Sequence, residues 1–460
     1  MVKKISRREF LEITGAVGLS FSLGQTKKEN RPNVIIVHAD QWRFSAFSHR
    51  ENHGLKTINI DKLQESGIVF ERTYSAYPLC TPNRSALITS RYPHSTGMIM
   101  NNLMLPPKEK GFAEIFRDAG YATHYIGKWH MDGPAKPGFV PKGWRRRGFE
   151  TFEGFNRGHA YYNTKTFSND GKLMKPGPYE PAFQVELAME FIKKHKERPF
   201  LLFLSWGPPH TPYKPPKGFR RFFNMKELPW RENVPRKLRS KKRMRHMYAG
   251  YLGLCESLDF EFGRLIKFIE KQGLRENTII VFTADHGDML GSHRLFFKNH
   301  PFEESARIPL IISWPKKIKE PKRLDVLVST IDIAPTILSL CGLPELPKAQ
   351  GKDLTPFIEG KQIEISSVYC EGRMGSQNKN KSKGEWRAIV TNDYKLVLGS
   401  KGEPTHLFSL KNDPLELKNL VNDPEHKKVV KSLLKEAKKW QEKTEDPFPN
   451  PAKKAKPFYG

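Results

Sequence analysis

Residues 33–41 read NVIIVHADQ, an unbroken apolar run that ends in a carboxylate and an amide. A run of β-branched residues without polar alternation is typical of a parallel strand that is buried on both faces of a sheet. Similar runs recur further along the chain, at residues 121–126, 200–205, 278–283 and 308–313. The sequence therefore predicts several buried strands that belong to one large sheet.

Segments with helical periodicity lie between these strands. Residues 183–194, 248–270 and 330–341 each place apolar side chains three or four positions apart, on one stripe. Alternation of strands with helices is the pattern of an α/β fold, because each crossover helix covers one face of a parallel sheet. We therefore predict an α/β fold with a large, mainly parallel sheet that is sandwiched by helices.

The last part of the chain has a different pattern. Residues 373–385 are rich in Gly, Ser, Asn and Lys, which is typical of a loop. Two strand-like runs at 386–391 and 394–398 are separated by two turn-forming residues, which indicates a hairpin, and a basic helix follows at about 424–444. We predict a signal and linker at 1–30, a large α/β domain at 31–375, and a smaller C-terminal α+β subdomain at 376–460.

The composition is strongly basic. The 460 residues include 78 Lys and Arg against 49 Asp and Glu, which gives a net charge of +29. Such an excess favours polyanionic partners, and nucleic acid, anionic lipid and sulfated polysaccharide all fit on charge alone. The alternative is that the excess lysine only solvates the surface. Four cysteines are too few for a disulfide scaffold.

The N-terminus is typical of an export signal. Residues 6–11 read SRREFL, which resembles the twin-arginine motif, and residues 13–23 are weakly apolar. The apolar stretch is about half as long as a membrane span requires. We predict a bacterial protein that is exported by the twin-arginine route to the periplasm or the medium, with no stable membrane span unless the signal is retained. The alternative is a frayed basic end of a cytoplasmic protein.

Polar side chains follow two of the predicted strands directly. Asp40 and Gln41 come after the first run, and Asp285 and His286 come after the run at 278–283. Ligands bind beyond the carboxyl ends of strands in open α/β sheets, so these side chains are candidates for one site. Two carboxylates with an amide oxygen suit a hard divalent cation such as Ca²⁺, and His286 is tolerable at one position. The alternative for each aspartate is a helix cap or a turn.

Cys80 begins the sequence CTPNR, which matches the pattern C-x-P-x-R. Enzymes that convert cysteine to formylglycine (3-oxoalanine) recognise this pattern. The hydrated aldehyde would carry two hydroxyls on one carbon, one to attack an ester and one to release the product. The alternative is a lone cysteine that serves as a small buried hydrophobe.

Four further cationic or titratable side chains are candidates for the same site. Lys128 and His130 end a predicted strand, and we expect the alternation of a strand to place them on one side. His210 lies in a proline-rich segment after another strand, where the prolines restrict the loop. Lys298 lies thirteen residues after Asp285, in a loop that could fold back over the site. Taken singly, each could be an ordinary surface or core residue.

The whole series of motifs resembles the type I, formylglycine-dependent sulfatases of the alkaline-phosphatase-like superfamily. The resemblance covers about residues 31–420. Its blocks, in the order of the family, are residues 32–41, 80–91, 120–130, 208–212, 278–287, 303–315 and 408–420. Seven blocks in this order are not expected by chance, and they imply the alkaline-phosphatase-like fold.

The resemblance implies a metal site and a modified residue. Asp40, Gln41, Asp285 and His286 would hold one Ca²⁺ per chain, with the formylglycine at Cys80 as a further ligand. The ion would polarise the sulfate and lower the pKa of the nucleophile.

The resemblance also assigns roles to the cationic side chains. Arg84 would stabilise the hydrated aldehyde, and Lys128, His210 and Lys298 would bind sulfate oxygens. His210 or Lys298 would protonate the leaving oxygen, and His130 would take a proton from the second hydroxyl so that inorganic sulfate leaves.

Three residues depart from the pattern of the family. Asn83 stands where Ser or Ala is usual, Ser90 stands where glycine is usual, and Gln41 replaces the second aspartate of many relatives. The C-x-P-x-R core is intact, and we therefore still expect Cys80 to be converted.

The substrate and partners follow from charge and resemblance together. We expect hydrolysis of sulfate esters on a sulfated oligo- or polysaccharide, because the net charge, the export motif and the basic segment 219–245 favour an anionic glycan. The alternatives are phosphonate or phosphate ester hydrolysis, an aryl sulfate as the main substrate, or a non-enzymatic polyanion-binding protein. The expected partners are the glycan and a formylglycine-installing maturation enzyme, and not nucleic acid.

Overall fold

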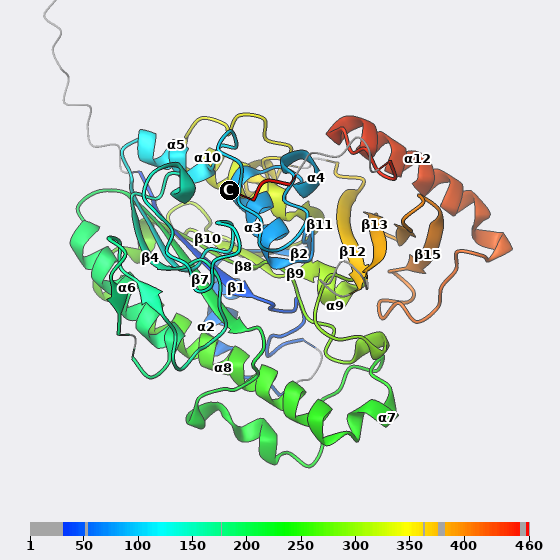
Figure 1. Cartoon of the computed structure of the whole chain (residues 1–460), viewed down its shortest axis with the longest axis horizontal. Helices are drawn as coiled ribbons and strands as arrows, with labels where there is room; N and C mark the ends of the chain where they lie inside the picture. Colours follow the sequence, from blue (N-terminus) through cyan, green and yellow to red (C-terminus); the bar gives the residue numbers. More distant parts are fainter. Residues whose placement is uncertain are drawn as a thin grey trace, which may run out of the picture. The chain divides into compact units, whose positions relative to one another are not determined.

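The strand β1 (Asn33–Asp40) lies in the interior of the main sheet, and all of its residues are buried (Figure 1). The computed structural model describes residues 31–50, 54–175, 177–361, 364–375, 382–450 and 457–459. The predicted signal segment, residues 1–30, lies outside the described residues. Across the main sheet the strands follow the order β11 (Lys322–Ser329), β2 (Ile68–Tyr74), β10 (Leu310–Ser313), β8 (Thr278–Ala284), β1, β7 (Phe200–Pro209), β3 (Ala122–Lys128), β4 (Thr151–Phe155), β5 (Thr166–Phe167) and β6 (Leu173–Met174).

The centre of this sheet is parallel, as predicted. β1 pairs in parallel with β8 on one side and β7 on the other, and β3 and β4 continue the parallel part. The predicted strand at 308–313 divides at Pro309 into β9 (Arg307–Ile308) and β10, because proline has no N–H to donate to a neighbour. β10 runs antiparallel to β8 and β2, and β9 pairs with β2.

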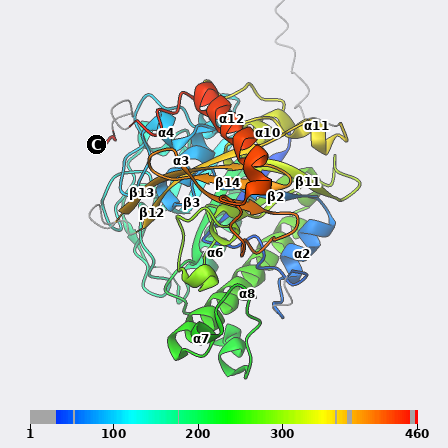
Figure 2. The same ribbon diagram turned by 90° about the vertical axis from the view of Figure 1, so that its right-hand side faces the viewer.

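Each face of the sheet has its own apolar core. Val34 and Ile36 pack into one core with α3 (Cys80–Thr89), α5 (Phe112–Asp118) and α10 (Ile333–Leu340). Ile35 and Val37 point the opposite way, into a core with α2 (Ile58–Glu65), α6 (Glu180–His195) and α8 (Lys242–Lys271). Both sets of alternate side chains in β1 are therefore covered, which is why its sequence shows no polar alternation. The two helical layers are visible in Figures 1 and 2.

The predicted helices form, and their ends are shifted by a few residues from the expected positions. α8 begins at Lys242, six residues before the predicted start at 248, and α10 is preceded by a single 3₁₀ turn at Thr330–Asp332. The short helices are α4 (Pro93–Thr96), α7 (Arg236–Arg239), α9 (Glu303–Ala306) and α11 (Thr355–Ile358), and 3₁₀ turns occur at Trp144–Arg146, Lys217–Phe219, Arg221–Asn224, Arg275–Asn277, Ser292–Arg294 and Pro424–His426.

A second, antiparallel sheet follows in the chain. Its order is β12 (Val368–Gly375), β13 (Ser382–Val390), β14 (Tyr394–Leu398) and β15 (Pro404–Ser409), and α12 (Lys427–Thr444) packs beside it. The predicted hairpin is present as β13 and β14. The loop predicted at 373–385 is shorter than expected, because backbone pairing of residues 373 and 374 with 385 and 384 continues both strands into this polar segment. β12 also precedes residue 376, where we placed the start of the C-terminal subdomain.

The second sheet shares its apolar contacts with the first part of the chain. Tyr369, Ile389 and Trp440 pack in one core with Tyr92 and Ala86. Figure 2 shows α12 lying across the strands of the second sheet. The described residues from Pro32 onward form one compact unit. Among the described residues, every helix is too short or too polar to span a membrane.

The aromatic cluster of α12 provides a test of this packing. The Trp440 ring lies parallel to Tyr369, with 6.0 Å between ring centroids, and meets Tyr92 edge-on at 6.1 Å. We expect Trp440→Ala to lower the free energy of unfolding by about 3–5 kcal/mol, because it leaves a cavity between the second sheet and α4. Urea denaturation of the variant measures this loss.

Lys438→Ala, at an exposed position of the same helix, is the matched control and should change the free energy of unfolding by about 0.5 kcal/mol or less. Equal denaturation midpoints for the two variants would show that Trp440 does not stabilise the fold.

Candidate active site

The predicted site residues meet where four neighbouring parallel strands end. Asp40 ends β1, Asp285 follows β8, Lys128 ends β3 and His210 follows β7. These strands are adjacent in the order β8, β1, β7, β3. The carboxyl ends of parallel strands therefore bring residues from distant parts of the chain to one place, as expected for an open α/β sheet.

Cys80 is the first residue of α3, and its side chain faces this place. Only 1% of Cys80 is exposed. Its Sγ lies 3.3 Å from His286 Nε2 and 3.9 Å from Asp40 Oδ1. Burial and the Asp40 carboxylate raise the pKa of the thiol, but the positive charges of nearby residues, Lys128 first, outweigh them and hold it below its usual value.

Asp40, Cys80, Asp285 and His286 form a buried cluster that suits a metal ion. Their ligand atoms all lie within 4.8 Å of one another. The Nδ1 atom of His286 lies 3.0 Å from the carbonyl oxygen of Gly287, so this nitrogen is assigned as the donor. The lone pair of Nε2 then faces the two carboxylates, as metal-ligating histidines require. Two carboxylates and an imidazole whose Nε2 faces them thus fit a hard divalent cation.

Arg84 supplies the positive charge that these carboxylates need. Its Nε donates to Asp285 Oδ2 at 3.2 Å, and its Nη2 lies 3.2 Å from Asp40 Oδ2. Its Nη1 donates to the carbonyl of Lys128 at 2.9 Å and to Ser205 Oγ at 2.7 Å. Burial alone would lower the pKa of Arg84, but Asp285 and Asp40 raise it above its usual value. The guanidinium therefore stays charged although it is buried.

Lys128 lies between the carboxylate cluster and two stacked histidines. Its Nζ donates to Asp40 Oδ2 and lies 3.3 Å from His159 Nε2. The rings of His159 and His210 stack with 3.7 Å between centroids. Burial opposes the ionised form of Asp40, but Lys128, His210 and Arg84 hold the pKa of its carboxyl well below the usual range. The site thus keeps Asp40 ionised and places a cation against it.

Lys298 folds back to the site, as its position in the sequence suggested. Its Nζ contacts His210 Nε2 and donates to Gln41 Oε1 at 2.8 Å. Gln41 has a φ of 72°, a strained value for a residue with a side chain, and its backbone N–H donates to Asp285 Oδ1 at 2.9 Å. In this arrangement the side chain of Gln41 links Lys298 to Asp288, to which it also donates.

His130 reaches the site by a route that differs from our expectation. β3 ends at Lys128, so strand alternation does not place the two side chains together. Instead the backbone of His130 turns at a φ of 59°, and its N–H bonds to the carbonyl of Asn156. Nδ1 of His130 is buried and has no hydrogen-bond partner among the described residues. Burial, Lys128 and Arg84 lower its pKa well below the usual value, so the ring is a neutral proton acceptor.

The structure accounts for the two unusual residues of the Cys80 segment. Asn83 is buried, and its amide donates to Ser75 Oγ and, at 2.9 Å, to Thr330 Oγ1. Ser90 ends α3 with a φ of 53°, the left-handed conformation for which glycine is usual. Its hydroxyl donates to the carbonyl of Ile331 at 2.7 Å. Both polar side chains therefore fasten α3 to the segment that precedes α10.

A pocket of about 230 Å³ opens onto these residues. It is lined by Cys80, Asn101, Asn102, His130, Lys136, Arg157, Gly158, His159, His210 and Lys298. Sequence reasoning identified Cys80, His130, His210 and Lys298 of this set. It missed His159, because only the path of the chain after β4 brings this residue onto His210. It also missed Lys136 and Arg157, which have no motif of their own.

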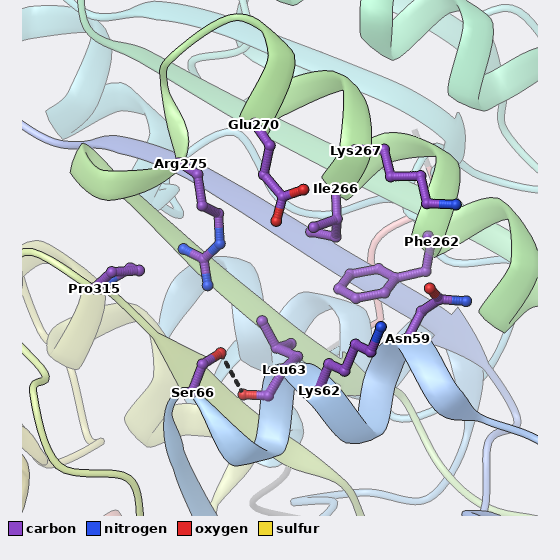
Figure 3. A pocket seen from close by; sticks show the side chains of 11 residues that line it. Asn59, Lys62, Leu63, Ser66, Phe262, Ile266, Lys267, Glu270, Arg275 and Pro315 are labelled. Atoms are coloured by element: carbon purple, nitrogen blue, oxygen red, sulfur yellow. Dashed lines mark hydrogen bonds between the residues drawn. The ribbon is translucent and has the colours of Figure 1, made fainter.

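A second hollow, of about 360 Å³, lies between α2 and α8 (Figure 3). Lys62, Phe262, Lys267 and Arg275 are among its lining residues, and none of the predicted site residues lines it. It lacks the convergence of buried titratable groups that marks a catalytic site. The smaller pocket at Cys80 is therefore the candidate active site.

Comparisons with known proteins identify the family of the chain. The sequence profile described as "Sulfatase" matches residues 32–343, and the profile described as "N-sulphoglucosamine sulphohydrolase, C-terminal" matches residues 291–443. The first match spans more than half of the chain and includes every predicted site residue.

Individual relatives are similar over most of their length. The chain is 31% identical to an ulvan-active sulfatase of Formosa agariphila over 89% of this chain and 81% of the relative. It is 28% identical to an endo-4-O-sulfatase of Bacteroides thetaiotaomicron over 95% and 97% of the two chains. Among solved structures, the yidJ protein of Bacteroides fragilis is 27% identical and superposes with a TM-score of 0.83, over 93% of this chain and 99% of that chain.

The carboxylate cluster generates a prediction about metal affinity. We expect protein that has been stripped with EDTA to bind one Ca²⁺, and Asp285→Asn to weaken that binding by at least about 100-fold, because it removes a ligand charge and a partner of Arg84. Isothermal titration calorimetry measures both affinities.

Asp325→Asn removes another aspartate that pairs with an arginine, Arg72, at an exposed position away from the site. We expect this control to bind Ca²⁺ like the unaltered protein. Equal weakening in both variants would place the ion elsewhere.

Proposed function

The chain belongs to the sulfatase family and is a sulfuric ester hydrolase, and we propose that it removes sulfate from a sulfated glycan with Cys80 converted to formylglycine and Ca²⁺ bound beside it. The overall reaction consumes one water and yields an alcohol, inorganic sulfate and a proton. The observation that carries the proposal is the convergence of Cys80, two carboxylates and His286 within 4.8 Å, beside Lys128 and below the pocket.

The residues that would hold the ion are Asp40, Asp285, His286 and the modified Cys80. Gln41, which we predicted as a further ligand, has its side-chain oxygen 2.8 Å from Lys298 Nζ in this structure. A bound Ca²⁺ would polarise the sulfate ester and favour ionisation of the nucleophile. Asp285 already accepts the backbone N–H groups of Gln41 and His286, both at 2.9 Å. These bonds fix the carboxylate before any ion binds, which reduces the cost of ordering the site.

Cys80 would gain its function by modification. A hydrated formylglycine would supply one hydroxyl that attacks sulfur and a second whose deprotonation lets the sulfate depart. The position at the first turn of α3 suits this role, because the N-terminus of a helix carries partial positive charge. Arg84 lies one helical turn further and directs its guanidinium at the same carboxylates.

Lys128, His210 and Lys298 would bind the oxygens of the sulfuryl group. The ammonium groups offset negative charge as the S–O bond to the sugar breaks, in a site where burial strengthens each interaction. The contact between Lys298 Nζ and His210 Nε2 would let the two candidate acids share one proton. Either of them can then deliver that proton to the departing sugar oxygen.

His130 would act as the base of the second half of the reaction. Its Nδ1 is buried without a protein partner, and its low pKa keeps it neutral at physiological pH. A neutral imidazole can accept a proton at Nδ1, which the release of sulfate requires. The sugar substrate is supported by the net charge of +29 and by relatives that are named for ulvan and for endo-4-O-sulfate activity.

The cellular route remains part of the proposal. We propose export by the twin-arginine pathway to the periplasm or beyond, from the sequence of residues 6–23. We also propose that a maturation enzyme acts on residues 80–84. An export signal would bring the enzyme to polysaccharides that do not enter the cell.

The conversion of Cys80 can be measured directly. When the chain is produced together with a formylglycine-installing enzyme, we expect mass spectrometry of the peptide that contains Cys80 to show the exchange of H₂S for one oxygen atom. Cys80→Ala should lower turnover by orders of magnitude, because no nucleophile remains. An unmodified thiol in protein that releases sulfate from a glycan would refute this mechanism.

The role of His130 predicts a second kinetic result. His130→Ala should lower kcat by about 10²- to 10⁴-fold, because a general base is lost. His195→Ala, at the exposed end of α6, is the control and should leave kcat unchanged. Sulfate release from a panel of defined sulfated oligosaccharides gives the rates, and a phosphonate monoester tests the competing activity. A His130→Ala enzyme that works at the normal rate would exclude this assignment.

A further inference from the structure

The pocket at Cys80 contains more positive charge than one sulfate group needs. Lys298 is held by Gln41 and His210, and Lys128 by Asp40. Two more cations, Lys136 and Arg157, line the same pocket, and its lining contains no Asp or Glu. Charges of one sign in a concave site raise the local concentration of an oppositely charged ligand. The extra pair therefore needs an explanation of its own.

Lys136 and Arg157 have no anionic partner within the described part of the chain. No ion pair or side-chain hydrogen bond joins either of them to another described residue, whereas Arg84 and Arg145 each pair with an aspartate. Arg157 is half-buried, and its charge is among those that lower the pKa of the neighbouring His130. A guanidinium that is withdrawn from solvent and left unpaired is a ready partner for an incoming carboxylate or sulfate.

Hydrogen bonds anchor the backbone segments that carry the two cations, while the side chain of Lys136 is exposed. The N–H of Arg157 donates to the carbonyl of Pro137, next to Lys136, at 2.9 Å. Asn156 is 0% exposed, and its amide nitrogen donates to the carbonyls of Gly133 at 2.9 Å and Ala135 at 3.2 Å. One buried side chain thus fixes the loop that precedes Lys136 to the segment that carries Arg157. The positive pair is built into the fold rather than carried on a free loop.

Lys136 and Arg157 line the same pocket as Cys80, so they lie near the ester that would react. Arg157 is two residues from His159, which contacts Lys128 and stacks on His210. Asn101 and Asn102 complete the same rim with amide groups that suit sugar hydroxyls. The pocket volume of about 230 Å³ is below the roughly 300–1,000 Å³ of sites for drug-sized ligands. It is suited to one sugar ring with its substituents.

We propose that Lys136 and Arg157 recognise a second anionic group on the substrate, one sugar unit or less from the ester that is cleaved. This inference rests on the proposed sulfatase function and adds a requirement to it. The preferred substrate is then not a sugar with one isolated sulfate. It is a sugar that carries a further sulfate, or a monosulfated sugar that is linked to a uronic acid, since a guanidinium binds either oxyanion in the same way.

Paired substrates test this requirement. The first is a monosulfated sugar glycoside that the enzyme cleaves, the second carries one added sulfate, and the third is the first joined to a uronic acid. We expect the double variant Lys136→Gln/Arg157→Gln to lose about 10- to 100-fold in kcat/KM on one or both of the doubly charged substrates, mainly through KM. On the monosulfated glycoside the loss should be less than about threefold. The doubly charged substrate with the larger loss of kcat/KM identifies the second group as sulfate or carboxylate.

Two further variants make the result specific. Arg157→Lys keeps the positive charge but loses the planar guanidinium that can donate two parallel hydrogen bonds. We therefore expect its kcat/KM on the doubly charged substrates to lie between those of the Gln variant and the unaltered enzyme. Lys165→Gln removes an exposed lysine of the same region that does not line the pocket, and it should behave like the unaltered enzyme. Unchanged thermal midpoints and Ca²⁺ affinities show that the variants are folded.

The outcomes separate the two proposals. A double variant that loses the same factor on all three substrates, or loses nothing on any, would overturn the second anion site while the sulfatase function stands. An unaltered, fully converted enzyme that releases sulfate from none of the three substrates, nor from a wider panel of sulfated sugars, would overturn the sulfated-glycan function on which this inference rests.

Discussion

The guanidinium of Arg84 is the interaction on which the site depends. It contacts Asp40 and Asp285 and donates to the carbonyl of Lys128 and the hydroxyl of Ser205. These four residues lie in or directly after four adjacent strands, β1, β8, β3 and β7. One buried cation therefore pairs with two carboxylates and links the four strands that surround the site. Removal of one partner from such a buried network typically costs about 3–5 kcal/mol, because the remaining charges stay buried without compensation.

Much of the fold was predictable because the decisive signal is local. The central strands are covered on both faces, so their sequences are continuous apolar runs that can be recognised without knowledge of their neighbours. β2 and β11 escaped recognition because they mix apolar with charged residues, as in IVFERTY and KRLDVLVS, and β11 lies at the edge of the sheet with one part exposed. β12 and β13 continue into a polar segment for a different reason. Their pairing depends on backbone hydrogen bonds between the strands, which side-chain polarity does not reveal.

The residues of the candidate site were likewise only partly predictable from the sequence. Asp40, Asp285 and Lys128 could be placed because a rule of topology brings strand ends together. His130 was assigned to the site for an incorrect reason, since a left-handed turn rather than strand alternation directs its ring. His159 and Arg157 could not be found, because their contacts arise only when the loop after β4 folds over the ends of β3 and β7. Charge in the sequence indicated an anionic partner, but only the structure shows which cations are already paired and which are available to a ligand.

The burial of α3 has a consequence for how the protein becomes active. Every residue from Cys80 to Thr89 is buried, and the first turn is enclosed by the ends of four strands. A maturation enzyme that acts on residues 80–84 would need access to them, which the buried helix does not offer. The pocket at Cys80 is open to a small molecule, whereas the backbone of residues 80–84 is enclosed. If Cys80 is converted as we propose, the conversion would therefore have to precede the burial of this helix.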